Sequence, residues 1–292
     1  MTTVTASMVK ELRDRTGLAM MECKKSLVEA GGDIELAIDN LRKSGQAKAA
    51  KKAGNIAADG AIIIAQGDNK AFLLEVNCQT DFVAKDENFT AFAEAVANIA
   101  LENNVTDVAA IAELPYGNGQ TVEEARVSLV QKIGENIQVR RVEVLEGSNL
   151  ASYRHGLRIG VVVSFEGGNA ETGKNLAMHI AAFNPVAVDD ESVDADLLAR
   201  EKDIIEAKAR ESGKPDNIVE KMIEGGLRKY LEEVTLLRQP YVMDNEKKVG
   251  DVLKAEGVKV LAFKRLEVGE GIEKKQEDFA AEVAATQALA NK

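Results

Sequence analysis

Residues 75–85 bring together side chains that could act on another protein. The segment reads Glu-Val-Asn-Cys-Gln-Thr-Asp-Phe-Val-Ala-Lys, and its polar break at 77–81 follows an apolar run. Phe82 then stands at a corner before a helical pattern, in a chain with 4% aromatic residues and no tryptophan. An aromatic ring on a loop could wedge between elements of a partner, and Asp81 beside it could compete for the partner's cations. The alternative, in which Phe82 packs against its own subdomain, is favoured by pattern alone.

A glycine-rich segment at 168–175 suggests a different chemistry. It reads Gly-Asn-Ala-Glu-Thr-Gly-Lys-Asn, and it lies between a strand pattern and a helix pattern, where a phosphate-binding P-loop would occur. A P-loop needs Ser or Thr after Lys174, because that hydroxyl coordinates Mg²⁺. Asn175 occupies this position, so the sequence favours a glycine-rich turn and a helix start. A nucleotide-using phosphotransferase built around Lys174 is the enzyme alternative, and it predicts nucleotide binding by the isolated chain.

Residues typical of hydrolytic, redox or metal sites are sparse. The two histidines, His155 and His179, have no second ligand at helical spacing, and Cys23 and Cys78 form no CxxC motif. We expect both thiols to be buried. His179 lies on an apolar helix pattern and is expected in a core, whereas His155 is expected in an exposed turn where it could contact a partner. The sequence therefore predicts no catalytic site, no metal site and no cofactor.

Composition restricts the class of protein. The 292 residues are 45% hydrophobic and 29% charged, which is typical of a globular chain long enough for two cores. The net charge of −11 disfavours direct binding to nucleic acid, since phosphate contacts require cations. We find no leader pattern and no apolar run that could span a membrane. A reduced cytoplasmic protein is expected.

The elements at the N-terminus are helical. Residues 1–45 predict three short helices with cap residues at Thr5 and Asp33, and Gly17 ends the first of them. A basic stretch at 42–52 follows, which is either a solvated helical linker or a contact for an acidic partner surface. We define 1–54 as a helical docking domain with its basic linker.

The elements that must carry the loop are strands and helices in two similar arrangements. The first subdomain, 55–146, predicts a hairpin at 61–65 and 71–76, helices at 86–101 and 122–134, and a strand at 137–145. The second, 147–188 and 234–270, predicts a strand at 159–165, a helix at 172–183, and strands near Val234 and at 258–268. The sequence at 140–147 resembles that at 264–271, which suggests a duplication. We expect an α+β fold with helices packed on mainly antiparallel sheets.

Residues 189–233 form an insert of different character. They hold 14 acids and 8 bases, and a break at 212–216 separates two helical patterns. An antiparallel helical hairpin is expected, which either buries its own seam or exposes an apolar stripe for self-association or for a partner. A chaperone-like interaction protein using this hairpin is a further alternative. The last module, 271–292, predicts a short helix at 279–289 that needs a surface to lie on.

Two segments resemble signatures of the elongation factor Ts family. Residues 12–27 are similar to the N-terminal signature, with Leu18 and Ala19 in place of its usual small pair, and residues 75–85 match the second signature throughout. Similarity continues at 132–136, 155–160 and 269–274, so the resemblance spans essentially the whole chain. Residues 116–121 look like a loop insertion.

The resemblance implies a fold and a function. The fold would be a ubiquitin-associated-like N-terminal domain, two related α+β subdomains, a helical hairpin and a C-terminal helix. The chain would be a guanine-nucleotide exchange factor, not an enzyme, and would bind elongation factor Tu with GDP and in its nucleotide-free state. The loop would disturb the partner's Mg²⁺ site, so the resemblance reverses the preference on Phe82. The loop residues and further candidate contacts are Thr80, Asp81, Phe82, Val83, Val9, Leu12, Arg13, Met20 and His155.

Overall fold

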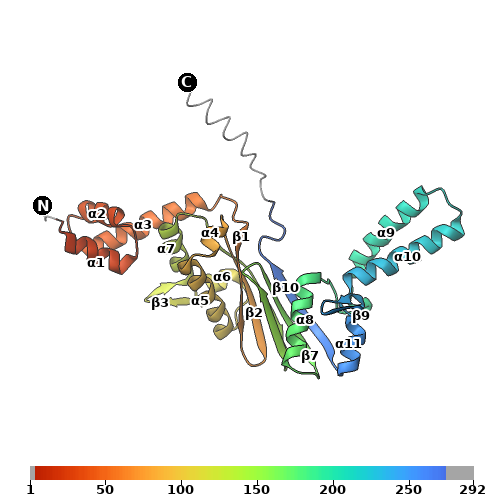
Figure 1. The fold of residues 1–292 in the computed structure, drawn as a ribbon. Coiled ribbons are helices and arrows are strands. Elements are labelled where there is room, and N and C mark those ends of the chain that lie inside the picture. Colours follow the sequence, from red (N-terminus) through yellow and green to blue (C-terminus); the bar gives the residue numbers. More distant parts are fainter. Residues whose placement is uncertain (1–3, 274–292) are drawn as a thin grey trace.

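The computed structural model describes residues 4–273 and confirms a mixed helix and sheet fold with antiparallel sheets (Figure 1). A three-helix unit and a hairpin of two long helices lie at opposite ends of a core that contains two three-stranded sheets. Within the described range no helix is long and apolar enough to cross a membrane. The helix predicted at 279–289 lies outside the described residues.

The N-terminal unit contains the three predicted helices. They are α1 (Ala6–Thr16), α2 (Met20–Glu29) and α3 (Ile34–Lys52). The side chains of Thr5 and Asp33 accept hydrogen bonds from the amides of Met8 and Leu36, so both predicted caps are confirmed. Gly17 ends α1 in the left-handed region, at φ 67°. Leu12, Cys23 and Leu27 are fully buried where the helices meet.

The basic stretch at 42–52 is the second half of α3, which confirms that it is helical. Gly45 and Ala49 are buried on the face that packs against α7 (Val122–Ile133). A methyl group on Gly45 would lie 2.4 Å from the side-chain oxygen of Gln131, so a larger residue there would force the Gln131 side chain to move. One helix therefore belongs to both the N-terminal unit and the core.

The first sheet and its helices follow the predicted order. The strands pair antiparallel in the order β1-β2-β5, and a small hairpin, β3–β4, occupies the predicted loop insertion. The elements are β1 (Asp59–Gln66), β2 (Lys70–Cys78), α4 (Asp81–Ala84), α5 (Glu87–Asn103), α6 (Val108–Ala112), β3 (Pro115–Gly117), β4 (Gln120–Thr121), α7 and β5 (Gln138–Glu146). The one-turn helix α4, directly after β2, has no counterpart in the sequence prediction.

The second sheet has the order β10-β7-β6, also antiparallel. The second subdomain contains β6 (Leu150–His155), β7 (Ile159–Glu166), α8 (Ala170–Phe183), the 3-10 turns η1 (Asp190–Ser192) and η2 (Leu236–Arg238), β8 (Pro240–Tyr241), β9 (Asp244–Lys248), α11 (Val249–Glu256) and β10 (Lys259–Glu267). β8 and β9 pair with each other in a separate two-stranded sheet. The prediction of a strand near Val234 is wrong. Val234 is the last residue of a helix, because its apolar neighbours at 227 and 231 continue the helical spacing.

The insert forms the predicted antiparallel hairpin, α9 (Ala195–Glu211) and α10 (Asp216–Val234) (Figure 1). Ala209 and Val219 are the buried residues of its two helices. Leu197, Ile204 and Ile218 are exposed apolar side chains. The contact between α9 and α10 thus fully buries few side chains.

The two sheets pack face to face, and each is covered by helices on its other face. Alternate residues of β2 point in opposite directions: Phe72 and Leu74 contact the helices, whereas Leu73 lies in the cluster between the sheets. Gly160 of β7 permits the close approach, because a methyl group there would lie 2.5 Å from the side chain of Ile62. Burial on both faces explains why these strands read as continuous apolar runs.

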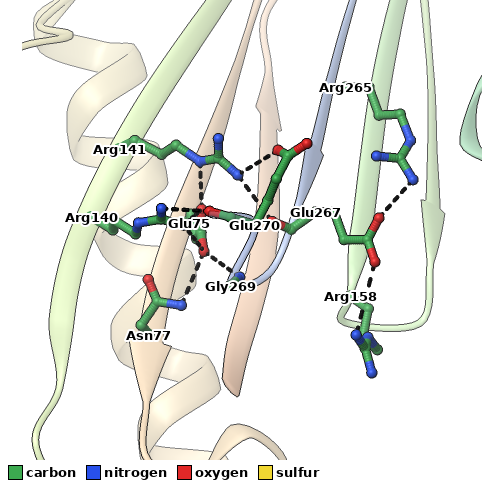
Figure 2. A network of polar contacts seen from close by, with 9 residues as sticks. All are labelled: Glu75, Asn77, Arg140, Arg141, Arg158, Arg265, Glu267, Gly269 and Glu270. Atoms are coloured by element: carbon green, nitrogen blue, oxygen red, sulfur yellow. Dashed lines mark hydrogen bonds and ion pairs between the residues drawn. The ribbon is translucent and has the colours of Figure 1, made fainter. Parts of the chain in front are cut away.

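A buried carboxylate joins the sheets near the start of the 75–85 segment. Glu75 is fully buried and accepts hydrogen bonds from Arg140 (3.0 Å), Arg141 (2.5 Å) and the amide of Gly269 (2.8 Å) (Figure 2). Asn77 donates a further bond at 3.0 Å. The strand that leads into the loop is therefore held to β5 and to the turn after β10.

Candidate functional site

The segment after β2 is a compact turn that ends in the helix α4. Thr80 is the N-cap of α4, and its hydroxyl accepts a hydrogen bond from the amide of Val83 at 3.4 Å. Ala84 is buried and Val83 is half-buried against the core cluster of the first subdomain. Val83 and Ala84 thus anchor the end of α4 to the core, whereas the residues at its start, Asp81 and Phe82, are exposed.

Phe82 projects from this turn. Its residue exposure is 81%, the highest of the large exposed apolar side chains in the described range. This exposure excludes the alternative in which the ring packs against its own subdomain. An exposed phenylalanine offers apolar area that is free to be buried against another molecule.

Asp81 lies beside the ring and is paired with Lys85. The ammonium of Lys85 donates to Oδ2 of Asp81 at 2.8 Å, one helical turn away, and both side chains are exposed. This hydrogen bond and the charge of Lys85 hold the pKa of the Asp81 carboxyl below its ordinary value. Asp81 is therefore ionised at neutral pH.

The base of the turn is held by Glu135, which follows α7 in the sequence. Its Oε2 accepts from the amides of Gln79 (3.0 Å) and Thr80 (3.1 Å), and its Oε1 accepts from the Thr80 hydroxyl (2.7 Å). No local motif in the sequence marks Glu135 as a site residue. The similarity at 132–136 was the available signal, but it does not reveal a contact across 55 positions.

Asn136 completes this support. Its amide donates to the side-chain oxygen of Gln79 at 2.8 Å, and its own side chain donates to the carbonyl of Asn55 at 2.8 Å. The side chain of Asn55 also donates to Gln79, at 3.1 Å. Three segments distant in sequence thus converge below the turn.

The N-terminal unit approaches the same region. A methyl group on Gly17 would lie 3.7 Å from the ammonium of Lys132, and Lys132 donates to the side chain of Asn88 at 2.6 Å. Asn88 lies in the first turn of α5, next to the cap residue Asp86. The turn between α1 and α2 is therefore close to the start of α5.

The other predicted contact residues differ in exposure. Val9 and Leu12 are buried in the core of the three-helix unit, so the expectation that they contact a partner is corrected; their periodic spacing reflects packing. Arg13 and Met20 are exposed. His155 is exposed at the end of β6, with Nδ1 3.2 Å from the hydroxyl of Tyr153. No hydrogen bond or ion pair within residues 4–273 joins His155 to the loop.

The remaining candidate chemistries have structural explanations. At the glycine-rich segment, the side chain of Asn169 accepts from the amides of Glu171 and Thr172, so it occupies donors that a phosphate would need. Burial raises the pKa of the Cys78 thiol to about 12, and Cys23 is also buried. Among the described residues no group of three or more His, Cys, Asp or Glu side chains could hold a metal ion.

A family model described as Elongation factor TS matches residues 79–270, which include the loop and both sheets. A protein of Psychrobacter cryohalolentis named elongation factor Ts is 92% identical over 289 residues, covering 99% of this chain and 98% of the relative. The Psychrobacter arcticus protein of the same name is also 92% identical, with the same coverage. An Acinetobacter baumannii elongation factor Ts is 72% identical over 291 residues, covering 99% of this chain and 100% of the relative.

Proposed function

Because the chain belongs to the elongation factor Ts family, we propose that it is a guanine-nucleotide exchange factor that promotes release of GDP from elongation factor Tu. GTP can then enter the emptied site. The chain binds the partner in its GDP-bound and nucleotide-free states, and no covalent bond is made or broken.

Thr80, Asp81, Phe82 and Val83 form the acting loop. Phe82 wedges between helices of the partner, and Asp81 disturbs the surroundings of the partner's Mg²⁺. Weakening the cation's contacts weakens the hold on the phosphates of GDP, since Mg²⁺ neutralises their charge. The observation that carries this proposal is the 81% exposure of Phe82 on a turn anchored by Ala84 and Glu135.

Binding of the chain to the partner and binding of GDP to the partner must weaken each other. By thermodynamic linkage, the chain lowers the partner's affinity for GDP by some factor, and GDP lowers the partner's affinity for the chain by the same factor. A complex of all three molecules is therefore short-lived, which suits a factor that must leave after exchange.

The other parts of the chain provide affinity. Residues 1–54 dock through exposed side chains such as Arg13 and Met20, His155 adds a contact from the second subdomain, and the module at 271–292 adds another. The net charge of −11 supports a role without direct nucleic-acid contact, and the free thiols of Cys23 and Cys78 support action in the reducing cytoplasm. The exposed apolar residues of the α9–α10 hairpin offer a surface for self-association.

The test is a mixing experiment. Elongation factor Tu is loaded with fluorescent GDP, the chain is added with excess unlabelled nucleotide, and loss of fluorescence is followed. We expect faster release that saturates with the concentration of the chain. Binding without acceleration would overturn the exchange function, and tight GDP or GTP binding by the isolated chain would support a nucleotide-using enzyme instead.

A further inference from the structure

We infer that Glu135 is a positioning residue that presets the direction of Phe82 before the partner binds. This inference rests on the proposed exchange function and names a residue that acts through the loop. Glu135 is half-buried and follows Gly134, which ends α7 in the left-handed region at φ 87°. Its carboxylate is thereby directed to the base of the turn, where it accepts three hydrogen bonds from two consecutive residues.

The Thr80 hydroxyl transmits this restraint to α4. It donates to Oε1 of Glu135 at 2.7 Å and accepts from the amide of Val83, so the same oxygen atom links Glu135 to the start of the helix. The orientation of a cap residue determines where its helix begins. Since Phe82 lies in the first turn of α4, fixing Thr80 fixes the direction in which the ring projects.

The contacts of Glu135 are consistent with this role. Its carboxylate forms no ion pair within residues 4–273, although many acids of the chain do. Its hydrogen bonds are made with the turn, and without them the half-buried amides of Gln79 and Thr80 would lose their acceptor. Glu135 is therefore committed to the turn.

The second subdomain holds its corresponding segment in a similar way. There Gln239-Pro240-Tyr241-Val242 is similar in order to Gln79-Thr80-Asp81-Phe82, so that Gln239 corresponds to Gln79 and Val242 to Phe82. A side chain distant in sequence, His179, contacts both Gln239 and Val242. Nδ1 of His179 accepts from the amide of Val242 at 3.2 Å, and Nε2 of His179 lies 2.9 Å from the side-chain oxygen of Gln239. In each subdomain the segment is thus held by a side chain from another element, the carboxylate of Glu135 in the first and the imidazole of His179 in the second.

A preset loop lowers the conformational entropy lost on binding and keeps the ring in the productive direction. When the restraint is removed, docking by the rest of the chain persists, but Phe82 engages the partner in only a fraction of complexes. We therefore expect Glu135→Ala to lower the maximal rate of GDP release about tenfold and to change the half-saturating concentration much less. Glu135→Gln keeps one acceptor oxygen for the two amides and should recover part of the rate.

Glu124 provides a matched control at the other end of α7. Its carboxylate accepts from the amide of Thr121 at 2.9 Å in a capping box, so Glu124→Ala removes an acidic side chain near the opposite end of α7 without touching the loop. Glu124→Ala should leave the maximal rate of release unchanged. Combining Glu135→Ala with Phe82→Ala should lower the rate no further than Phe82→Ala alone, because Glu135 acts through the ring.

A second measurement needs no partner. The chain contains no tryptophan, so Phe82→Trp introduces a unique fluorophore at the tip of the turn. Time-resolved anisotropy of the folded chain should show more fast local motion of Trp when Glu135→Ala or Glu135→Gln is added, and no increase when Glu124→Ala is added. Unchanged local motion in both Glu135 variants would overturn the inference.

The two measurements separate this inference from the proposed function. If the wild-type chain does not accelerate GDP release, the exchange function fails whatever the anisotropy shows. If the wild-type chain accelerates release and both Glu135 variants match its maximal rate, only the positioning role fails.

Discussion

The ammonium of Lys85 lies 2.8 Å from Oδ2 of Asp81, so the acid of the loop is already paired with a cation in the free chain. Both side chains are exposed, and such a pair contributes little to stability because water and salt screen it. Asp81 can therefore exchange Lys85 for a cation or a polar group of the partner at little cost. The pairing keeps the acid ionised and available.

Asp81→Asn should slow GDP release and weaken its dependence on Mg²⁺. The substitution keeps the shape of the side chain but removes the charge that disturbs the cation's surroundings. Release rates would be measured at low and high Mg²⁺ concentrations. Asp68→Asn, in the exposed turn at the other end of the β1–β2 hairpin, is the control with the same change of charge. An unaltered Mg²⁺ dependence in Asp81→Asn would rule out the electrostatic role.

The pH dependence of this role follows from the lowered pKa of Asp81. A carboxyl with a lowered pKa stays ionised throughout the range above its ordinary value of about 3.9, and protonates only below it. Between pH 6 and pH 8 the Asp81 contribution to GDP release should therefore be constant. A ratio of wild-type to Asp81→Asn rates that changes across this range would contradict the assignment.

Phe82→Ala should separate function from stability. Since the ring is 81% exposed, its removal should change the free energy of unfolding by no more than about 0.5 kcal/mol, while GDP release slows markedly. Phe89→Ala is the contrasting variant, because Phe89 is fully buried on α5 and its loss should cost about 3–5 kcal/mol. Urea unfolding and GDP release would be measured on both. If Phe82→Ala promoted GDP release at the wild-type rate, the proposed wedging role of Phe82 would be ruled out.

The features that sequence predicted correctly have local causes. The caps Thr5 and Asp33, the β1–β2 hairpin and the buried His179 each follow from a few adjacent residues or from one helical period. The exposure of Phe82 was different, because pattern alone favoured packing and only the family resemblance favoured projection.

The features that sequence did not predict depend on long-range contacts or on competing patterns. Glu135 reaches Thr80 across 55 positions, and no local signal marks an acid that accepts from a distant turn. The apolar spacing of Val9 and Leu12 is the same for a core as for a docking face, and only the packed helices distinguish them. α4 is a single turn, too short to show a period.

Glu75→Ala should destabilise the core strongly. The substitution leaves Arg140 and Arg141 without their buried partner, and breaking such a pair costs about 3–5 kcal/mol. Glu143→Ala is the matched control on the neighbouring strand, because Glu143 pairs with Lys264 at the surface and should contribute less than about 1 kcal/mol. Free energies of unfolding from urea titrations would compare the two. A small loss in Glu75→Ala would show that the network is dispensable.

The carboxylate of Glu75 should also make the free energy of unfolding depend on pH in the acidic range. Burial tends to raise the pKa of Glu75, but the bonds from Gly269, Asn77 and Arg141 lower it overall. A lowered pKa in the folded state gives stability that is fully present above the ordinary value of about 4.3 and is lost as pH falls through the folded pKa. Below about pH 4 the wild-type chain should therefore lose stability faster than Glu75→Gln.

His179 should make stability rise with pH in a different window. Nδ1 of His179 accepts from the amide of Val242, so Nε2 carries the proton and donates to Gln239 in the neutral ring. Burial lowers the pKa of His179 below its ordinary value, and protonation would also place a proton on Nδ1 against the Val242 amide. The unfolded chain therefore binds a proton first as the pH falls below about 6.5.

It follows that the free energy of unfolding should increase with pH between the lowered pKa of His179 and about 6.5, by at most about 1.4 kcal/mol per pH unit from this group. Urea titrations at several pH values from 5 to 8 would measure it. His179→Gln should be less stable at neutral pH but should lack this part of the slope, because glutamine does not titrate. His155→Gln, at the exposed end of β6, should keep it. If His179→Gln retained the full slope, another group would have to be responsible, and the neutral, hydrogen-bonded imidazole could not explain how the second subdomain responds to acid.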